Sequence, residues 1–222
     1  MNGVLGAILP LAIAVTISPL PIIAEILLLF TKRPVGNAGA YLAGFLVGVA
    51  VVLSLLVAAA NTIDLATSGP SRGAAVVQLA LGILLVVAAV RQFRSRPSEG
   101  QVAPEPKWMS GIAGFSPGKS LGVGTAIGAA NPKNIAVGVA AAAAISSASL
   151  DTGQMIVAIV FYVVVAGLGV AAPLMVTVVY RDKAQDILDG WKTWLGHNNA
   201  AVMAVLFLVF ATVLIGKGIA GL

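Results

Sequence analysis

The sequence predicts an all-α integral membrane protein with six transmembrane helices, built as two inverted three-helix repeats. Of the 222 residues, 59% are hydrophobic and only 9% are charged, whereas soluble domains carry about 25% charged residues. Apolar runs of about 20 residues recur along the chain, and each can cross roughly 30 Å of hydrocarbon. Similar motifs also recur in the same order in the two halves, which favours the repeat.

The expected spans cover residues 3–30, 37–60, 73–91, 120–145, 153–180 and 199–220. No basic residue precedes the first apolar run, which is longer than the apolar region of a secretory signal. We therefore expect a retained first span. The links between spans two and three and between spans four and five are short and polar, as antiparallel neighbours require.

The longest polar segment divides the chain into three regions. Residues 1–91 form the first repeat, 92–119 a cytoplasmic linker and 120–222 the second repeat. The linker is rich in Pro, Gly and charged residues, which bury too little apolar surface to fold alone. Within the second repeat, residues 181–197 form an amphipathic pattern with Trp191 and Trp194 on its apolar side. This pattern predicts an interfacial helix.

Basic residues are distributed unequally between the two ends of the expected spans. Ten Lys and Arg residues follow spans one, three and five: Lys32, Arg33, Arg91, Arg94, Arg96, Lys107, Lys119, Arg181, Lys183 and Lys192. Only Arg72 and Lys217 lie on the other side. Because cytoplasmic loops are enriched in Lys and Arg, we expect a multi-pass protein with both termini extracytoplasmic.

The repeat rests on matches that keep their order. In an alignment without a large gap, Ser18-Pro19-Leu20-Pro21 lies over Asn131-Pro132-Lys133-Asn134. With eight residues more separation, Tyr41 lies over Tyr162 and Gly48 lies over Gly169. Three spans per half is an odd number, so the second half must enter the membrane from the opposite face. Inverted repeats of this kind give transporters two exchangeable states.

The proline motifs mark the candidate substrate site. Each proline removes a backbone donor and breaks the helix, and freed carbonyls are tolerated in a membrane only where they face protein or water. Paired breaks in two halves indicate a transport site. The expected substrate-binding residues are Ser18, Pro19, Pro21, Glu25, Asn131, Pro132, Lys133 and Asn134, with Thr16 and Thr125 as further lining residues.

Lys133 and Glu25 are the ionisable residues placed well inside expected spans. Either charge is costly at mid-depth and should face the bundle interior. The sequence allows two interpretations. The two side chains form a structural salt bridge, or Lys133 binds an anionic group of the substrate while Glu25 exchanges protons.

Several classes of function lack their signals. The chain has no cysteine, which excludes disulfides and thiolate metal sites. No Ser/His/Asp set, HExxH motif or pair of catalytic carboxylates occurs, so we expect neither an enzyme, a metal site nor a cofactor. The net charge of +5 fits cytoplasmic loops, and no basic tract interleaved with aromatics suggests nucleic acid.

These motifs resemble the lysine-exporter (LysE) superfamily. Asn131-Pro132-Lys133-Asn134 in the fourth span, with a proline-broken first span, carries the likeness. The basic, Pro-rich linker and Ser18-Pro19-Leu20-Pro21 are most similar to its GAP branch of peptidoglycolipid-addressing, or Sap-like, proteins. The resemblance implies a plasma-membrane exporter without an ATPase of its own, in a branch implicated in moving cell-envelope glycolipids.

The resulting hypothesis is an exporter or flippase for a lipid-linked or amphiphilic envelope component, working by alternating access between helices one and four. Its expected partners are membrane lipids and an amphiphilic or anionic small molecule. A second copy of the chain and envelope-lipid synthesis proteins are further candidate partners. Two rivals stay open: a LysE-type exporter of amino acids or small ions, and a membrane scaffold for a lipid-synthesis complex.

Overall fold

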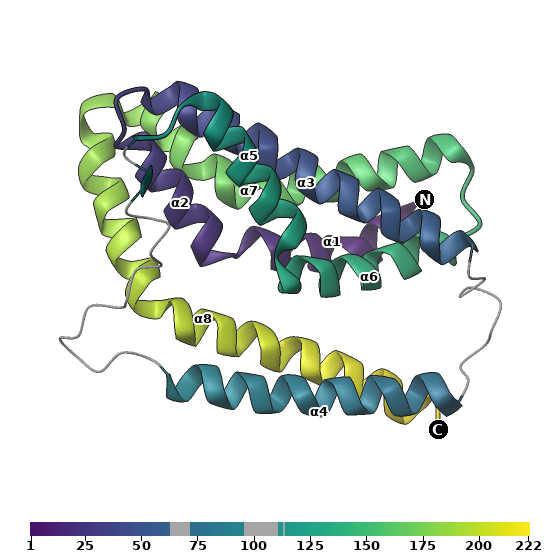
Figure 1. Cartoon of the computed structure of the whole chain (residues 1–222). Helices are drawn as coiled ribbons and strands as arrows, with labels where there is room; N and C mark the ends of the chain where they lie inside the picture. The colour runs from purple at the N-terminus through teal and green to yellow at the C-terminus, as the bar shows by residue number, and fades with distance from the viewer. Residues whose placement is uncertain (63–71, 96–110, 113) are drawn as a thin grey trace. The chain divides into compact units, whose positions relative to one another are not determined.

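The computed structural model describes residues 1–62, 72–95, 111–112 and 114–222. Its elements are α1 (Asn2–Thr16), α2 (Pro19–Leu29), α3 (Pro34–Thr62), α4 (Arg72–Arg94), α5 (Pro117–Ala130), α6 (Pro132–Ser146), α7 (Thr152–Tyr180), the 3₁₀ turn η2 (Arg181–Lys183) and α8 (Ala184–Ala220) (Figure 1). The described residues contain no strand, so the all-helical prediction is confirmed.

Apolar helices identify a membrane protein. Pro34–Ala60 and the stretch Thr152–Ala220 are each long and apolar enough to cross a membrane. The pair α1 and α2, bent by 53° at its break, adds a third span if the two helices cross together. Helices α5 and α6 have 14 and 15 residues, because the break at Asn131 divides the expected fourth span. The count of six spans therefore stays a prediction.

Two compact units make up the chain: Met1–Thr67 with Glu105–Lys192, and Ser68–Pro104 with Thr193–Leu222. They cut across the expected regions 1–91, 92–119 and 120–222, which stay a prediction. Most of the expected linker, residues 96–110 and 113, lies outside the described residues. The expected interfacial segment 181–197 becomes η2 and the start of α8, which continues to Ala220. No proline interrupts this stretch, so the helical hydrogen bonds can continue.

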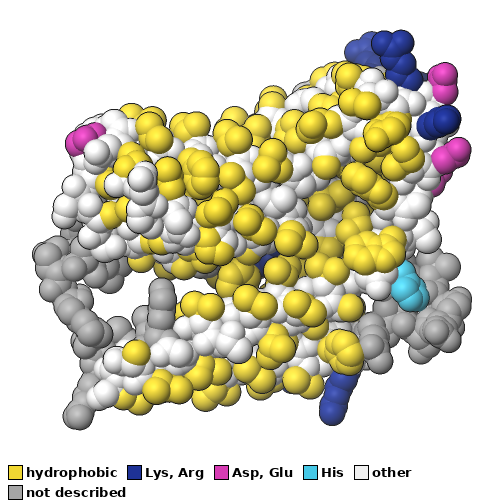
Figure 2. Space-filling view, turned by 180° about the vertical axis from the view of Figure 1, so that it is seen from behind, with side chains coloured by type: hydrophobic (Ala, Val, Ile, Leu, Met, Phe, Trp, Pro, Cys, Tyr) yellow, Lys and Arg dark blue, Asp and Glu magenta, His cyan; other side chains and the backbone are white. Residues whose placement is uncertain are grey.

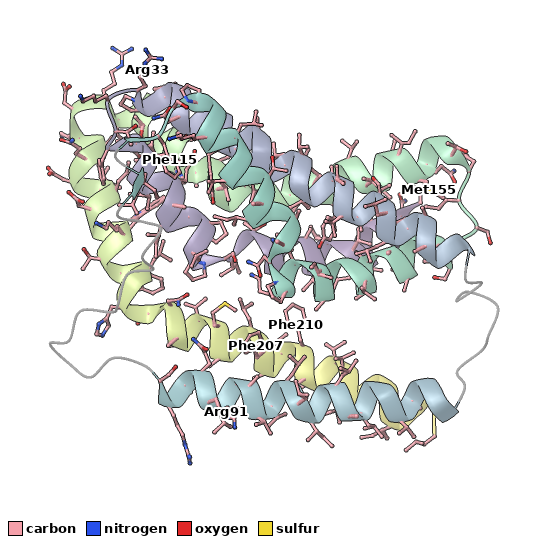
Figure 3. The ribbon with its side chains drawn as sticks, viewed as in Figure 1. Arg33, Arg91, Phe115, Met155, Phe207 and Phe210 are labelled. Carbon is pink, nitrogen blue, oxygen red and sulfur yellow. The ribbon has the colours of Figure 1, made fainter. Side chains whose placement is uncertain are left out.

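The exposed Lys and Arg residues that the structure describes in the first unit lie at one end. Lys32 and Arg33 join α2 to α3, Lys119 lies in the first turn of α5, and Arg181 follows α7; all four are exposed. Figure 3 shows Arg33 at this end and Met155 at the other, and the N-terminus lies toward the Met155 end (Figure 1). Apolar side chains cover most of the face between the ends (Figure 2). Lipid is the solvent that such a surface requires.

In the second unit, α4 packs against the part of α8 that follows residue 192, through small residues. A Cβ added to Gly218 would lie 2.9 Å from the Ala75 carbonyl oxygen, and one added to Gly82 would lie 3.2 Å from the Ala211 carbonyl oxygen. Both helices expose large apolar side chains elsewhere, such as Leu84. Each glycine also makes room for a large side chain of the facing helix, Ile215 beside Gly82 and Leu79 beside Gly218. Glycines at such contacts are typical of helices that associate within lipid.

Candidate functional site

The first break separates α1 from α2 at Ile17 and Ser18. Ser18 is extended, with φ −118° and ψ 103°, because the following Pro19 disfavours a helical conformation in the residue before it. Pro19 then opens α2, where a missing N–H costs nothing. The Ser18 N–H donates to the Thr16 carbonyl instead of continuing the helix. Carbonyl groups at the end of α1 are thus left to find other donors.

The second break lies at Asn131, between α5 and α6. Asn131 is extended, with φ −71° and ψ 116°, and its Oδ1 accepts a hydrogen bond from the Lys133 N–H at 3.0 Å. This is the N-cap arrangement that asparagine favours, with Pro132 at the first helical position. The Asn134 Nδ2 donates back across the break to the Gly128 carbonyl at 3.4 Å. Local chemistry therefore explains each helix end at the two predicted motifs.

Lys133 connects the two breaks. Its side chain is 7% exposed, and its Nζ donates to the Ala14 carbonyl at 2.8 Å and toward the Ile17 carbonyl at 3.5 Å. The ammonium group therefore caps the carboxyl end of α1, where free carbonyls concentrate negative charge. The structure brings together two segments separated by more than a hundred residues in the sequence.

Glu25 lies on α2, about two turns beyond the break, and is fully buried. Neither of its carboxyl oxygens has a hydrogen-bond partner among the described residues. The salt bridge that one interpretation expected is thus absent from this conformation, since Lys133 bonds the carbonyls of α1 instead. A buried carboxyl group without a partner is costly in its charged form.

The two expected lining residues play different parts. Thr16 Oγ1 donates to the Ala12 carbonyl of its own helix at 3.1 Å and to the Val165 carbonyl of α7 at 2.5 Å. Thr125 Oγ1 donates to the Leu121 carbonyl at 2.9 Å, inside α5. Thr16 therefore ties the end of α1 to another helix, whereas Thr125 satisfies its hydroxyl locally.

Tyr41 and Tyr162 are more closely tied to the site than sequence reasoning recognised. Both are buried, and the Tyr41 hydroxyl donates to the Pro21 carbonyl in the first turn of α2 at 3.2 Å. The Tyr162 hydroxyl is buried without a partner. The repeat alignment pairs these two residues, and that pairing was the available signal.

Asn37, in the first turns of α3, was missed. It is 1% exposed, and its Nδ2 donates to Thr31 Oγ1 at 2.9 Å and to the Phe115 carbonyl at 3.0 Å. Phe115 lies near the end of the unit that carries Arg33 (Figure 3). Asn37 thus fastens the chain before α5 to the turn between α2 and α3. An asparagine in the first turns of an apolar span could have identified this contact from the sequence, because a buried amide needs hydrogen-bond partners.

Glycine contacts bring α3 against α5. A Cβ on Gly44 would meet the Leu121 carbonyl, and one on Gly48 would lie 2.9 Å from the Ala129 nitrogen. The contact is reciprocal, since Cβ atoms on Gly124 and Gly128 would meet the Tyr41 and Phe45 carbonyls. Each helix therefore carries glycines four residues apart, the spacing that allows two membrane helices to approach closely. Both breaks are attached to this framework, because α2 and α6, the helices that begin after the two breaks, both pack against α3.

The two breaks thus bring together one buried cation, Lys133, with amide and hydroxyl groups in apolar surroundings. Glu25 is buried further along α2, and no described contact joins it to Lys133. No group of three or more His, Cys, Asp or Glu residues able to hold a metal ion occurs in the described part of the chain.

Comparison with known proteins gives a family. The family model described as "Sap, sulfolipid-1-addressing protein" matches residues 8–220, nearly the whole chain. Searches of the curated proteins and of the solved structures found no match. The matched region contains both breaks and every residue of the expected site. The chain therefore belongs to the Sap, sulfolipid-1-addressing protein, family.

Proposed function

We propose that this protein moves an amphiphilic cell-envelope lipid with an anionic head group across the plasma membrane, and that the head group binds between the two breaks. The family name links its members to a sulfolipid, a molecule that combines an anionic group with apolar chains. Lys133 is the observation that carries the proposal, because it is a buried cation held only by backbone carbonyls. Those carbonyls are weaker partners for an ammonium group than a sulfate is.

The proposed mechanism is alternating access through inverted repeats of LysE type, with both termini extracytoplasmic. Packing between the halves supports the repeat. In the alignment that pairs the two breaks, Gly48 corresponds to Gly169 and Ala129 corresponds to Thr16. A Cβ on Gly48 would meet Ala129, and a Cβ on Gly169 would meet the Thr16 carbonyl. Equivalent glycines thus approach equivalent positions next to the two breaks, in the sense expected for a twofold relation.

The charges also support this orientation. Exposed Lys32, Arg33 and Lys119 gather at one end of the first unit, and the N-terminus lies toward the other. An end rich in Lys and Arg is expected on the cytoplasmic side, where it meets anionic lipids. An anionic lipid would therefore meet attractive charge at the end from which export begins.

A lipid-translocation assay tests the proposal. The chain is reconstituted in vesicles containing a fluorescently labelled sulfated glycolipid, and dithionite bleaches the label in the outer leaflet. The wild type should let dithionite bleach most of the label, while protein-free vesicles keep the inner half protected. Lys133→Met should restore protection, whereas Arg94→Met, which removes an exposed cation of α4, should behave like the wild type.

The two rival functions give different results in the same assay. A membrane scaffold would leave the label protected in the wild type and in both variants. An exporter of amino acids or small ions would also leave the lipid protected, and would instead release a radiolabelled amino acid from loaded vesicles. Either result would replace the lipid-transport proposal.

A further inference from the structure

Glu25 is the buried ionisable group that lipid binding at Lys133 does not use. It is 0% exposed, and neither carboxyl oxygen has a hydrogen-bond partner in the part of the chain that the structure describes. The neighbouring buried residues of α2 are apolar, among them Ala24 and Ile26. A carboxylate in such surroundings is strongly disfavoured without a cation beside it. Burial without a partner therefore favours the neutral, protonated form of Glu25.

The helices packed against α2 supply no compensating charge. They are α3, α5 and α7. The buried titratable groups on them are the phenols Tyr41 and Tyr162, and phenols are neutral at physiological pH. Lys119 of α5 is exposed in that helix's first turn. Lys133, on α6, is bonded to the carbonyls of α1.

Glu25 lies on a short helix that follows a break in the chain. Helix α2 has 11 residues and is separated from α1 by the extended Ser18. A single described side-chain hydrogen bond, from the Tyr41 hydroxyl to the Pro21 carbonyl, ties its first turn to α3. If α2 turns at Ser18, this bond opens and Glu25 can reach a hydrated surface. Hydration favours loss of the proton, and burial favours its return.

We propose that Glu25 is the proton-binding site that couples lipid export to the proton gradient. This inference rests on the proposed function and names its energy source. The Glu25 carboxylate takes one proton from water on the extracytoplasmic side and becomes neutral. Helix α2 then packs as in this structure. When α2 opens toward the cytoplasm, the same O–H bond breaks, the proton passes to cytoplasmic water and the carboxylate is restored. One proton thus moves inward for each return of the site, while the lipid moves outward.

The protonation of Glu25 can be measured without any lipid substrate. Infrared spectroscopy of the purified chain at neutral pH should show the C=O stretch of one protonated, buried carboxylic acid. This band should be lost in Glu25→Gln and shifted in Glu25→Asp. The aspartate variant assigns the band even if the glutamine variant folds poorly. A wild-type spectrum without the band at neutral pH would mean that Glu25 is charged, and would overturn the proposal.

Coupling to α2 can be followed with a single cysteine, because the chain has none of its own. With Ser18→Cys as reporter, a hydrophilic maleimide should label the wild-type background several-fold faster at alkaline than at neutral pH. On the Glu25→Gln background the labelling rate should rise only as far as titration of the thiol itself requires. The ratio of the two rates then gives the part that depends on Glu25. Equal pH dependence of the labelling rate in both backgrounds would refute coupling. A labelling rate that changes when sodium replaces potassium would also refute it, because the coupling ion would then be sodium and not a proton.

These measurements separate the two proposals. The infrared band and the labelling rates need no translocation, so they stand if the lipid assay fails. Lipid movement that depends on Lys133 but ignores both pH and Glu25→Gln would keep the proposed function and remove its proton coupling.

Discussion

A double-mutant cycle on Lys133 and Glu25 tests the central geometry of the site. The variants are Lys133→Met, Glu25→Gln and the double substitution. Methionine keeps most of the length of the lysine side chain, and glutamine is nearly isosteric with the carboxylic acid. The cycle therefore removes the polar interactions of each residue with little change in volume.

The expected magnitudes follow from the hydrogen bonds. The bond from Lys133 Nζ to the Ala14 carbonyl is 2.8 Å long, whereas the distance to the Ile17 carbonyl, 3.5 Å, is at the limit for a hydrogen bond. Removing the ammonium group leaves a buried carbonyl without a donor, which costs about 1–3 kcal/mol. Glu25 has no partner to lose, so Glu25→Gln should change stability by less than about 1 kcal/mol.

The coupling energy decides between the two arrangements. With Lys133 on the carbonyls of α1, the double variant should equal the sum of the single variants within about 0.5 kcal/mol. If the residues formed a buried ion pair, each single change would leave an unpaired charge and cost about 3–5 kcal/mol, and the double change would recover stability. Reversible unfolding by SDS in mixed micelles measures all four free energies. A coupling energy of about 2 kcal/mol or more would refute the geometry described here.

Three further predictions use matched variants or reporters. Reporter fusions at Ser95 and at the C-terminus should give opposite signals, cytoplasmic and extracytoplasmic; equal signals would contradict the proposed topology. Gly124→Ala should destabilise the fold by about 1–3 kcal/mol in SDS unfolding, because its Cβ would meet a backbone carbonyl. Gly122→Ala, with nothing within 4 Å, should be neutral or stabilising, and an equal cost at both positions would refute the helix contact. Tyr41→Phe should cost about 1 kcal/mol for its lost hydrogen bond, whereas Tyr162→Phe should cost nothing because its hydroxyl is unpartnered; the reverse order would contradict these assignments.

The helix breaks could be predicted because their cause is local. Pro19 and Pro132 cannot donate a backbone hydrogen bond, and proline disfavours a helical conformation in the residue before it. The signal is not sufficient alone, because Pro10 and Pro173 lie inside α1 and α7. The helix α7 likewise begins at Thr152, where Asp151 and Gln154 form a reciprocal capping box, close to the expected start at residue 153. Such features depend on neighbours in the sequence and are therefore visible in it.

The partners of Lys133 could not be predicted for the opposite reason. Sequence placed Lys133 and Glu25 as isolated charges in apolar spans, and pairing them was one of two reasonable solutions to the cost of burial. A backbone carbonyl is present at every residue and leaves no mark in the sequence. That Ala14 would supply it depends on how α6 packs on α1, which is a tertiary property.

The partners of the glycines in α5 could not be predicted. Sequence analysis cannot tell which of several glycines will meet a neighbouring helix, because Gly122 and Gly124 lie in the same short run of small and apolar residues. In the structure, Gly124 faces the Tyr41 carbonyl and Gly122 faces open space. The two positions lie on different sides of α5, and only the direction from which α3 approaches distinguishes them.

The reciprocal glycine contact between α3 and α5 limits how the molecule can change shape. At these glycines no side chain separates the two backbones. If one helix slid along the other by one residue, a neighbouring side chain would collide with a carbonyl group of the facing helix. Because α3 comes from the first half of the sequence and α5 from the second, we expect this contact to stay fixed while the chain bends at Ser18 and Asn131. On the proposed function, a crosslink between α3 and α5 should then leave export intact, whereas one that pins α2 to α3 should stop it.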